Sequence, residues 1–506
     1  MLESLNEAVH KTKEAANREK GALTRKLGEM GIEVPLVDVE IQFIGASGLP
    51  KMDVVGSADP YFVAKIDHRI SFVSNVVRNS LAPVWNEIWR IKNVPSTADL
   101  AVEVHDKDEG SATDDFIGKF NISLSAGAKE VQIEGPVLAL RKSRGTFWLK
   151  IDSKPSTMRK KEEFQYLFDG PIRFTRHFSP TVGLFTSSAI TTNTAGSNAD
   201  PGGRSSIHGH RRDSRLYSTW KFVIKAVPLF FRNVHQDWNT KYPAAQKIFG
   251  AGPTSLAVRS GIQAGHRMLY ARLASNGYGV IDNRMEGGVE EPVSLKTILN
   301  AGSGPEGVSS AEGGAGGERI KPAVYTYIIS SADDSLRFSE TGAAFFVDFA
   351  SKHALHSNCA QHVRYSGEFH PRPVGGWANF NDSIADDDID WELVVDNNSG
   401  TYAPDKMMLP TVQECLEYNF GCGLAERNSK GERGFRVVVY DREDERLVES
   451  REACRNYAVN VRGVSQDDLE PHVHDGEVTL NQTASPNLQE TFNAPNSVQP
   501  LATPES

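Results

Sequence analysis

The chain has 506 residues, of which 39 % are hydrophobic and 24 % charged, with a formal net charge of -10. This length allows two or three domains, no run approaches the ~20 apolar residues of a membrane-spanning helix, and the acidic balance argues against nucleic-acid binding. It also disfavours permanent attachment to anionic lipid, unless a local feature reverses the field. The four cysteines show no CxxC spacing, so we expect a reducing compartment without disulfides or a zinc site.

The first 33 residues predict an N-terminal helix. Residues 1–30 alternate charge signs around apolar side chains such as Leu5 and Val9, which is typical of a solvated amphipathic helix. Basic and acidic residues nearly balance, which favours packing on the protein itself over membrane anchoring. The segment has no apolar signal core, so we expect a cytoplasmic location.

Short strands dominate the next region, from about residue 36 to 152. Val37, Val39, Ile41 and Phe43 step by two, which is the period of a strand with one buried face. Turn residues separate the segments at the spacing of an all-β sandwich. The other predicted strands are Tyr61–Ala64, Ile88–Ile91, Leu100–Val104 and Phe147–Ile151.

Five aspartates fall on the predicted loops of this region. Asp53 and Asp59 flank a short turn, and Asp106 and Asp108 follow a strand at alternate positions, which places both on one side. Asp115 closes the same loop from its far end. Loop carboxylates suit Ca²⁺, which takes roughly 6–8 oxygen ligands. One or two bound ions would lower or reverse the local charge, so that anionic phosphate headgroups could complete the coordination.

The region resembles a C2 domain, as found in conventional protein kinase C and the synaptotagmins. The resemblance covers residues 36–152, under a quarter of the chain, and implies an eight-stranded antiparallel β-sandwich with Ca²⁺-binding loops at one end. The first strand leads into the Asp53 loop, which favours the circularly permuted, phospholipase-type arrangement. The matching residues are Leu49-Pro50 before Asp53, Asp59-Pro60-Tyr61-Phe62, Pro83-Val84-Trp85-Asn86-Glu87, Val104 with Asp106-Lys107-Asp108, and Asp115-Phe116-Ile117-Gly118.

The resemblance implies a set of metal ligands. Because the third loop is one residue longer than in the best-studied members, Asp114 is an alternative to Asp115. The alternative to Ca²⁺ binding is an acidic loop rim that contacts another protein. The implied ligands are Asp53, Asp59, Asp106, Asp108 and Asp115.

Membrane contact is expected at the loop tips. Val54 and Val55 can insert shallowly, and Lys107 is the base of a third loop that has no large apolar residue. We therefore expect weak insertion, mainly electrostatic attraction and reversible binding. Neighbouring strands also carry a candidate phosphoinositide patch, with solvated sheet charge as its alternative. The patch consists of Lys65, Arg90 and Lys92.

Residues 160–462 predict an α/β domain of unknown function, following a linker at 153–161. We expect flexible insertions at 186–214 and 301–318, and a disordered tail at 464–506. Residues 216–274 predict mostly helix. Beyond them, strands at 324–329, 363–369, 391–395 and 435–440 alternate with helices that open at Ser339 and Leu409, which suggests a largely parallel sheet.

Polar clusters in this domain have ordinary structural readings. The acidic run at 386–390 is typical of a solvated loop. Residues 396–402 resemble an EF-hand loop, but the glycine and the closing acid are misplaced, which favours an Asx turn. His353, His356 and Cys359 share a helix spacing without an HExxH motif. No nucleophile elbow or phosphate-binding loop is present.

The combined prediction is a cytoplasmic protein whose C2 domain binds anionic phospholipid when Ca²⁺ is present. One alternative is a lipid-modifying or hydrolytic enzyme that its C2 domain delivers to membranes, although no catalytic motif supports it. Another is a protein-interaction scaffold.

Overall fold

The structure is a computed structural model, and it describes the chain with gaps. The predicted helix at 1–33, the insertions at 186–214 and 301–318, and all but the first residue of the tail lie outside the described residues. The described residues are 34–52, 57–108, 114–136, 143–157, 164–178, 218–232, 234–237, 246, 248–270, 278–284, 290–300, 320–340, 356–384, 388–399, 403–421, 427 and 431–464.

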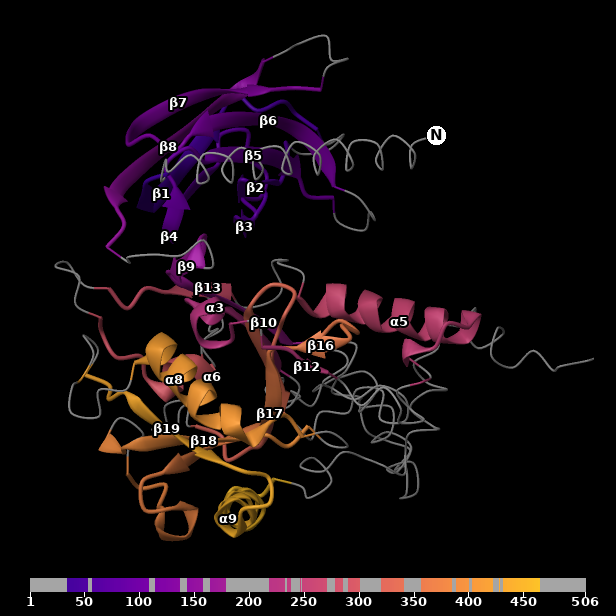
Figure 1. Ribbon diagram of the computed structural model, residues 1–506, viewed down its shortest axis with the longest axis vertical. Coiled ribbons are helices and arrows are strands. Elements are labelled where there is room, and N and C mark those ends of the chain that lie inside the picture. Colours follow the sequence, from indigo (N-terminus) through magenta and orange to yellow (C-terminus); the bar gives the residue numbers. More distant parts are fainter. Residues whose placement is uncertain are drawn as a thin grey trace, which may run out of the picture.

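An antiparallel β-sandwich forms the first domain, as predicted (Figure 1). One leaf has the strand order β3-β2-β5-β6 and the other β7-β8-β1-β4, and the pair Lys119–Glu134 joins them between β6 and β7. The strands are β1 Leu36–Ser47, β2 Pro60–Ile66, β3 Ile70–Val73, β4 Val84–Pro95, β5 Asp99–Asp106, β6 Asp115–Ser123, β7 Gly127–Glu134 and β8 Ser143–Pro155. Residues 153–155, predicted as linker, therefore continue β8.

Alternation along the strands builds the core between the leaves. Val39, Ile41 and Phe43 of β1 are at most 3 % exposed, because every second side chain of a strand points to the same face. Phe43 and Phe62 lie 4.6 Å apart between ring centroids, and Phe147 meets Phe62 edge-on at 5.4 Å. Such aromatic pairs add to the hydrophobic stabilisation of the core.

Gly118, the glycine of the Asp115–Gly118 motif, allows the sandwich to close. A Cβ atom at this position would lie 2.6 Å from the carbonyl oxygen of Glu134 on β7. The residue therefore has to be glycine for β6 to approach β7, and the motif serves the fold as well as the loop before it.

The second domain is built on an eight-stranded sheet with the order β13-β10-β11-β15-β14-β17-β18-β19. A separate two-stranded ladder joins β12 and β16. The strands are β10 Ile172–Phe178, β11 Ser218–Val223, β12 Gln236–Asp237, β13 Tyr278–Ile281, β14 Tyr325–Ile329, β15 Ser335–Glu340, β16 His362–Val363, β17 Tyr365–Pro373, β18 Trp391–Asp396 and β19 Phe435–Tyr440.

Helices flank this sheet. In Figure 1, α6 and α8 lie on one side of β18 and β19, and α9 lies on the other. Val412, Cys415 and Leu416 of α8 enter the apolar core, whereas Ser450 of α9 bonds to β17 through His370. The helices are α3 Val227–Phe230, α5 Pro253–Tyr270, α6 Leu295–Asn300, α8 Leu409–Phe420 and α9 Glu445–Asn460, with short 3₁₀ turns at Trp377–Asn379 and Lys406–Met408.

Three expectations for this domain were wrong in detail. The sheet is mostly antiparallel, and β18–β19 is its one parallel pair among the described strands. Ser339, the predicted start of a helix, lies inside strand β15 with its hydroxyl 2.8 Å from His356 Nε2, and residues 341–350 of that helix lie outside the described residues. The segment at 216–274 contains strands β11 and β12 beside helix α5. Predicted strands at 324–329, 391–395 and 435–440 and the helix from Leu409 are confirmed within two residues at each end.

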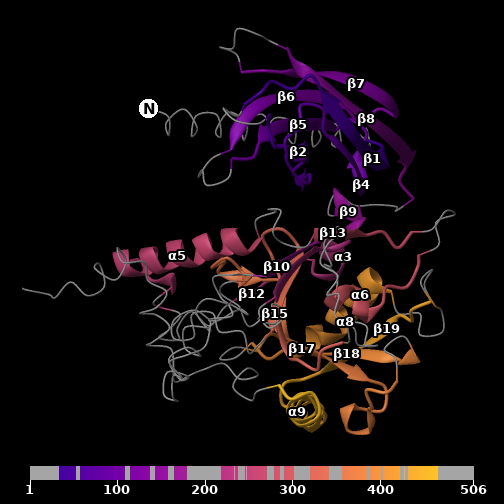
Figure 2. The ribbon, with the colours of Figure 1, turned by 180° about the vertical axis from the view of Figure 1, so that it is seen from behind.

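The two domains share a strand. β9, Leu167–Gly170, pairs antiparallel with β4 and adds a ninth strand to the first sheet. Figure 2 shows β9 between the sandwich and the second domain. Three residues further on, Arg173 of β10 reaches Glu87 of β4 with an Nη2–Oε2 distance of 2.5 Å. The domains are therefore joined by backbone pairing and by a buried ion pair.

Candidate calcium and membrane site

Strand register places three of the predicted ligands at one end of the sandwich. Pro60, the residue after Asp59, lies opposite Asp106 in the β2–β5 ladder. Asp106 in turn lies opposite Asp115 in the β5–β6 ladder, so their side chains share a face. The start of β2, the end of β5 and the start of β6 thus bring Asp59, Asp106 and Asp115 to the same end.

Hydrogen bonds hold the inner part of this end in place. The Asp106 side chain is fully buried, and its Oδ1 accepts the backbone N–H of Asp59 at 2.5 Å. Asp59 Oδ1 accepts the backbone N–H of Asn79 at 2.7 Å, and the Asp59 carbonyl oxygen accepts the N–H of Lys107 at 3.0 Å. These bonds connect three loops, so Asp59 and Asp106 are positioned by the scaffold.

Asp114, the alternative ligand, is already engaged by its neighbours. Its Oδ1 is 2.8 Å from Lys107 Nζ, and its Oδ2 accepts the hydroxyl of Tyr61 at 2.7 Å. Burial raises the pKa of this carboxyl, but the hydrogen bonds from Lys107 and Tyr61 outweigh burial and hold the pKa below its ordinary value. Asp115, by contrast, is exposed. The structure therefore favours Asp115 over Asp114 as the side chain available to a cation.

The described carboxylates at the loop end do not form a complete metal site. Within the described ranges, no group of three or more His, Cys, Asp or Glu side chains is arranged to hold a metal ion. Asp53, Val54 and Val55 lie outside those ranges, as do residues 109–113 of the third loop. The donors present are hard carboxylate oxygens, the type that Ca²⁺ prefers. The residue types fit the ion, while the described geometry shows only part of a site.

Two exposed apolar residues at this end were missed in the sequence. Val84, which begins β4, is 71 % exposed, and Phe116 of β6 is 36 % exposed. The Ala46 N–H bonds to Pro83, and the Ser80 N–H bonds to Ala58, which places the start of β4 beside the first loop. Val84 directly follows Pro83 and Phe116 directly follows Asp115, both within the C2 motifs. Their place next to the loops could have indicated an apolar surface there.

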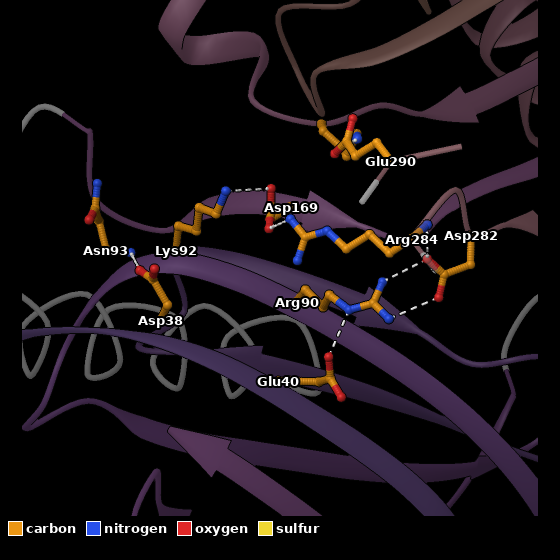
Figure 3. A network of polar contacts seen from close by, with 10 residues as sticks. Asp38, Glu40, Arg90, Lys92, Asn93, Asp169, Asp282, Arg284 and Glu290 are labelled. Carbon is orange, nitrogen blue, oxygen red and sulfur yellow. Dashed lines mark hydrogen bonds and ion pairs between the residues drawn. The ribbon is translucent and has the colours of Figure 1, made fainter. Parts of the chain in front are cut away.

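The candidate phosphoinositide patch is divided in the structure: Arg90 and Lys92 of β4 face the second domain, whereas Lys65 of β2 lies in the other leaf, so the prediction of neighbouring strands was wrong. Arg90 makes two hydrogen bonds to Asp282, at 3.0 and 2.8 Å, and a third to Glu40 at 2.7 Å. Lys92 Nζ is 3.1 Å from Asp169. Figure 3 shows Arg90 between Glu40 and Asp282, with Lys92 directed to Asp169. Lys65 pairs with Glu103 at 3.2 Å within the sandwich.

Acidic clusters in the second domain are neutralised internally. Arg451 contacts Asp396 at 2.5 Å and Glu368 at 2.7 Å. Burial raises the pKa of Asp396 to about 7 despite the nearby guanidinium. Asp396 Oδ1 also accepts the N–H of Asn398 at 2.7 Å, an Asx turn as predicted. His356 is buried against Ser339. His353 lies outside the described residues, so the predicted helix spacing is not described.

Comparisons with known proteins agree on the first domain. The C2 domain family model matches residues 37–138. Extended synaptotagmin-1 of Pongo abelii is 45 % identical over 74 residues, covering 14 % of this chain and 6 % of that protein. A calcium-dependent lipid-binding protein of Arabidopsis thaliana is 29 % identical over 140 residues, covering 24 % of this chain and 27 % of that protein. The chain therefore spans less than a third of either relative.

A solved structure covers the same region. A C2 domain of plant extended synaptotagmin 1 is 25 % identical, with a TM-score of 0.22, and the match covers 24 % of this chain and 98 % of that one. Among the described residues, no helix is long and apolar enough to cross a membrane. The motifs, the strand order and the family match agree, and the β-sandwich at residues 36–152 is a C2 domain.

Proposed function

We propose that this protein binds anionic phospholipid membranes through its C2 domain when Ca²⁺ is present. The observation that carries the proposal is the placement of Asp59, Asp106 and Asp115 at one loop end, with the buried Asp106 carboxylate fixed by the Asp59 N–H. The names of the two curated relatives, an extended synaptotagmin and a calcium-dependent lipid-binding protein, support the same role.

The proposed ligand set keeps the residues found in the sequence. Asp59 and Asp106 provide the positioned carboxylates, Asp108 is half-buried, and Asp115 provides an exposed carboxylate. Asp53 completes the set from the first loop. Asp114 instead holds Lys107 and Tyr61, and this arrangement orients the third loop. Bound Ca²⁺ would supply positive charge at a loop end that otherwise repels phosphate.

Membrane contact in this proposal combines electrostatic and apolar elements. Val54 and Val55 remain the proposed tips of the first loop. Val84 and Phe116 add exposed apolar surface at the same end. Lys107 contributes less than its charge suggests, because its ammonium group pairs with Asp114. The contact area is small, so binding should be reversible and should weaken as salt is added.

Vesicle sedimentation tests the proposal. The full chain should sediment with phosphatidylserine-rich vesicles in Ca²⁺ and should stay in the supernatant in chelator. Asp106→Asn with Asp108→Asn should abolish the Ca²⁺-dependent fraction. Equal sedimentation with and without chelator, or unchanged binding by this double variant, would rule the proposal out.

A matched control separates the ligand effect from the change in net charge. Glu130 of β7 and Glu449 of α9 are exposed and lie in different domains. Glu130→Gln with Glu449→Gln removes the same two negative charges, and this variant should sediment like the wild type. Calorimetric titration of Ca²⁺ in the absence of lipid then distinguishes loss of metal binding from loss of membrane contact.

A further inference from the structure

The basic face of the C2 domain is used as a docking surface for the second domain. Three cationic side chains on or next to β4 and β10 meet carboxylates across the domain boundary. They are Arg90 with Asp282, Lys92 with Asp169, and Arg173 with Glu87. In two of these pairs the cation belongs to the C2 domain, and in the third it belongs to the second domain.

The interface has a buried inner part. Arg173 and Glu87 are each 8 % exposed, and the Arg173 guanidinium lies 4.0 Å from the ring centroid of Phe72. Arg173 Nη1 also donates to the carbonyl oxygen of Val73 at 2.8 Å. The adjoining β9 strand pairs with β4. Arg173 thus bonds to strands β3 and β4 of the C2 domain, and these contacts fix the position of β10 against that domain.

The outer part of the interface is half-exposed and consists of ion pairs. Asp282 of the second domain is 33 % exposed and contacts Arg90 across the interface, while Glu40 of β1, 43 % exposed, contacts the same guanidinium from within the C2 domain. Asp169 receives Lys92 from one side and Arg284 from the other. Burial opposes charge on Asp282, but the hydrogen bonds from Arg90 outweigh it and hold the pKa of Asp282 below its ordinary value.

We propose that docking of the second domain closes this basic face of the C2 domain to lipid phosphate. The carboxylates of Asp282 and Asp169 occupy the hydrogen-bonding positions of Arg90 and Lys92 that headgroup phosphates would need (Figure 3). A planar guanidinium binds carboxylate and phosphate in the same two-pronged manner, so the two compete for one site. Of the two C2 surfaces considered for lipid, the loop end is thereby the one left open among the described residues. The inference concerns the lipid-binding role proposed above, but its test needs no Ca²⁺.

The test uses the full chain in chelator with vesicles of phosphatidylcholine and phosphatidylinositol 4,5-bisphosphate. The wild type should bind these vesicles only weakly, and Arg90→Ala with Lys92→Ala should leave this weak binding unchanged. Glu40→Gln with Asp282→Asn, which frees Arg90 from both carboxylates, should bind at least about fivefold more tightly than the wild type, the gain expected from one basic residue at an anionic surface. Adding Arg90→Ala to this variant should remove the gain.

Two controls make the result decisive. Glu130→Gln with Glu449→Gln carries the same change in net charge away from the interface and should show no gain. The unfolding midpoint shows whether the double variant is folded. If it folds poorly, Asp282→Asn alone serves as a milder variant and should show a smaller gain.

The opposite results would overturn the inference. Binding by the wild type that Arg90→Ala with Lys92→Ala removes would show that the face is open. A folded Glu40→Gln, Asp282→Asn variant without any gain would show that the carboxylates exclude nothing. Failure of the Ca²⁺-dependent role would appear separately, as absent binding to phosphatidylserine vesicles in Ca²⁺.

Discussion

Carboxylates gather in both domains, but their surroundings differ. In the second domain, Asp396 and Glu368 share the guanidinium of Arg451, and backbone N–H groups complete the cluster. At the loop end of the C2 domain, Lys107 pairs with Asp114, Asp59 and Asp106 accept backbone N–H groups, and Asp115 is exposed. A buried cluster built around a guanidinium serves the fold, whereas carboxylates held by neutral N–H groups at a loop end suit an exchangeable cation. The same residue type therefore serves structure in one domain and, in our proposal, binding in the other.

Removing the internal cation should give the largest effect. Arg451→Met leaves Asp396 and Glu368 buried without their guanidinium, which should lower the free energy of unfolding of the second domain by about 3–5 kcal/mol. Denaturant unfolding measures the loss. Arg446→Met on the same helix is the control, because Arg446 is 71 % exposed and pairs with Asp444 at the surface. Equal effects of the two substitutions would contradict the structural role of the buried cluster.

Adding a cation should stabilise the other cluster. With Ca²⁺ at a hundred times its dissociation constant, the free energy of unfolding of the C2 domain should rise by about 2.7 kcal/mol. Asp59→Asn with Asp115→Asn should abolish this gain. In chelator the same variant should be at least as stable as the wild type, because the substitutions relieve repulsion. A variant that is less stable in chelator would indicate that these acids serve the fold.

Acid should distinguish the domains through His370. Burial, with contributions from Arg451, Arg372 and Arg455, lowers the pKa of this histidine from 6.5 to about 3. The unfolded chain therefore binds a proton that the folded chain excludes. The free energy of unfolding is therefore unaffected by His370 above pH 6.5. It falls as the pH drops from 6.5 toward 3, and the loss is on the order of 2 kcal/mol near pH 5.

The pH effect is isolated by comparison with a variant. Asp396 acts in the opposite direction, because its raised pKa favours the folded state as the pH falls below 7. His370→Gln should therefore reduce the acid sensitivity of the second domain relative to the wild type, while unfolding of the C2 domain is unchanged. Identical pH profiles for wild type and variant would show that the pKa of His370 is the same in the folded and unfolded chains.

The smallest effect should come from the two adjacent aspartates of the third loop. Asp114→Asn weakens a half-buried pair with Lys107, so the C2 domain should lose about 1 kcal/mol or less and should keep its Ca²⁺ response. Asp115→Asn should leave stability unchanged and should weaken Ca²⁺ binding. The reverse result in calorimetric titration would assign the ligand to Asp114.

The C2 domain was predictable because its strands have a clean period of two and its loop motifs are specific. The choice between Asp114 and Asp115 was not predictable, since it depends on Tyr61 reaching across from another strand. The second domain was harder for a related reason. Strands buried on both faces, such as Tyr325–Ile329, show no alternation, and the order of strands in a sheet depends on distant pairings. Arg90 and Lys92 looked like free surface charge because their partners lie 192 and 77 positions away, at Asp282 and Asp169.

The pairing of β9 with β4 has a consequence for work with fragments. Cutting the chain at the predicted linker, near residue 157, would remove β9 and leave the backbone of β4 as an open sheet edge. It would also strip Glu87 of its guanidinium partner. Open edges invite pairing with other chains, so such a fragment should self-associate more than one that ends after Arg173, which keeps β9 on β4 and the partner of Glu87.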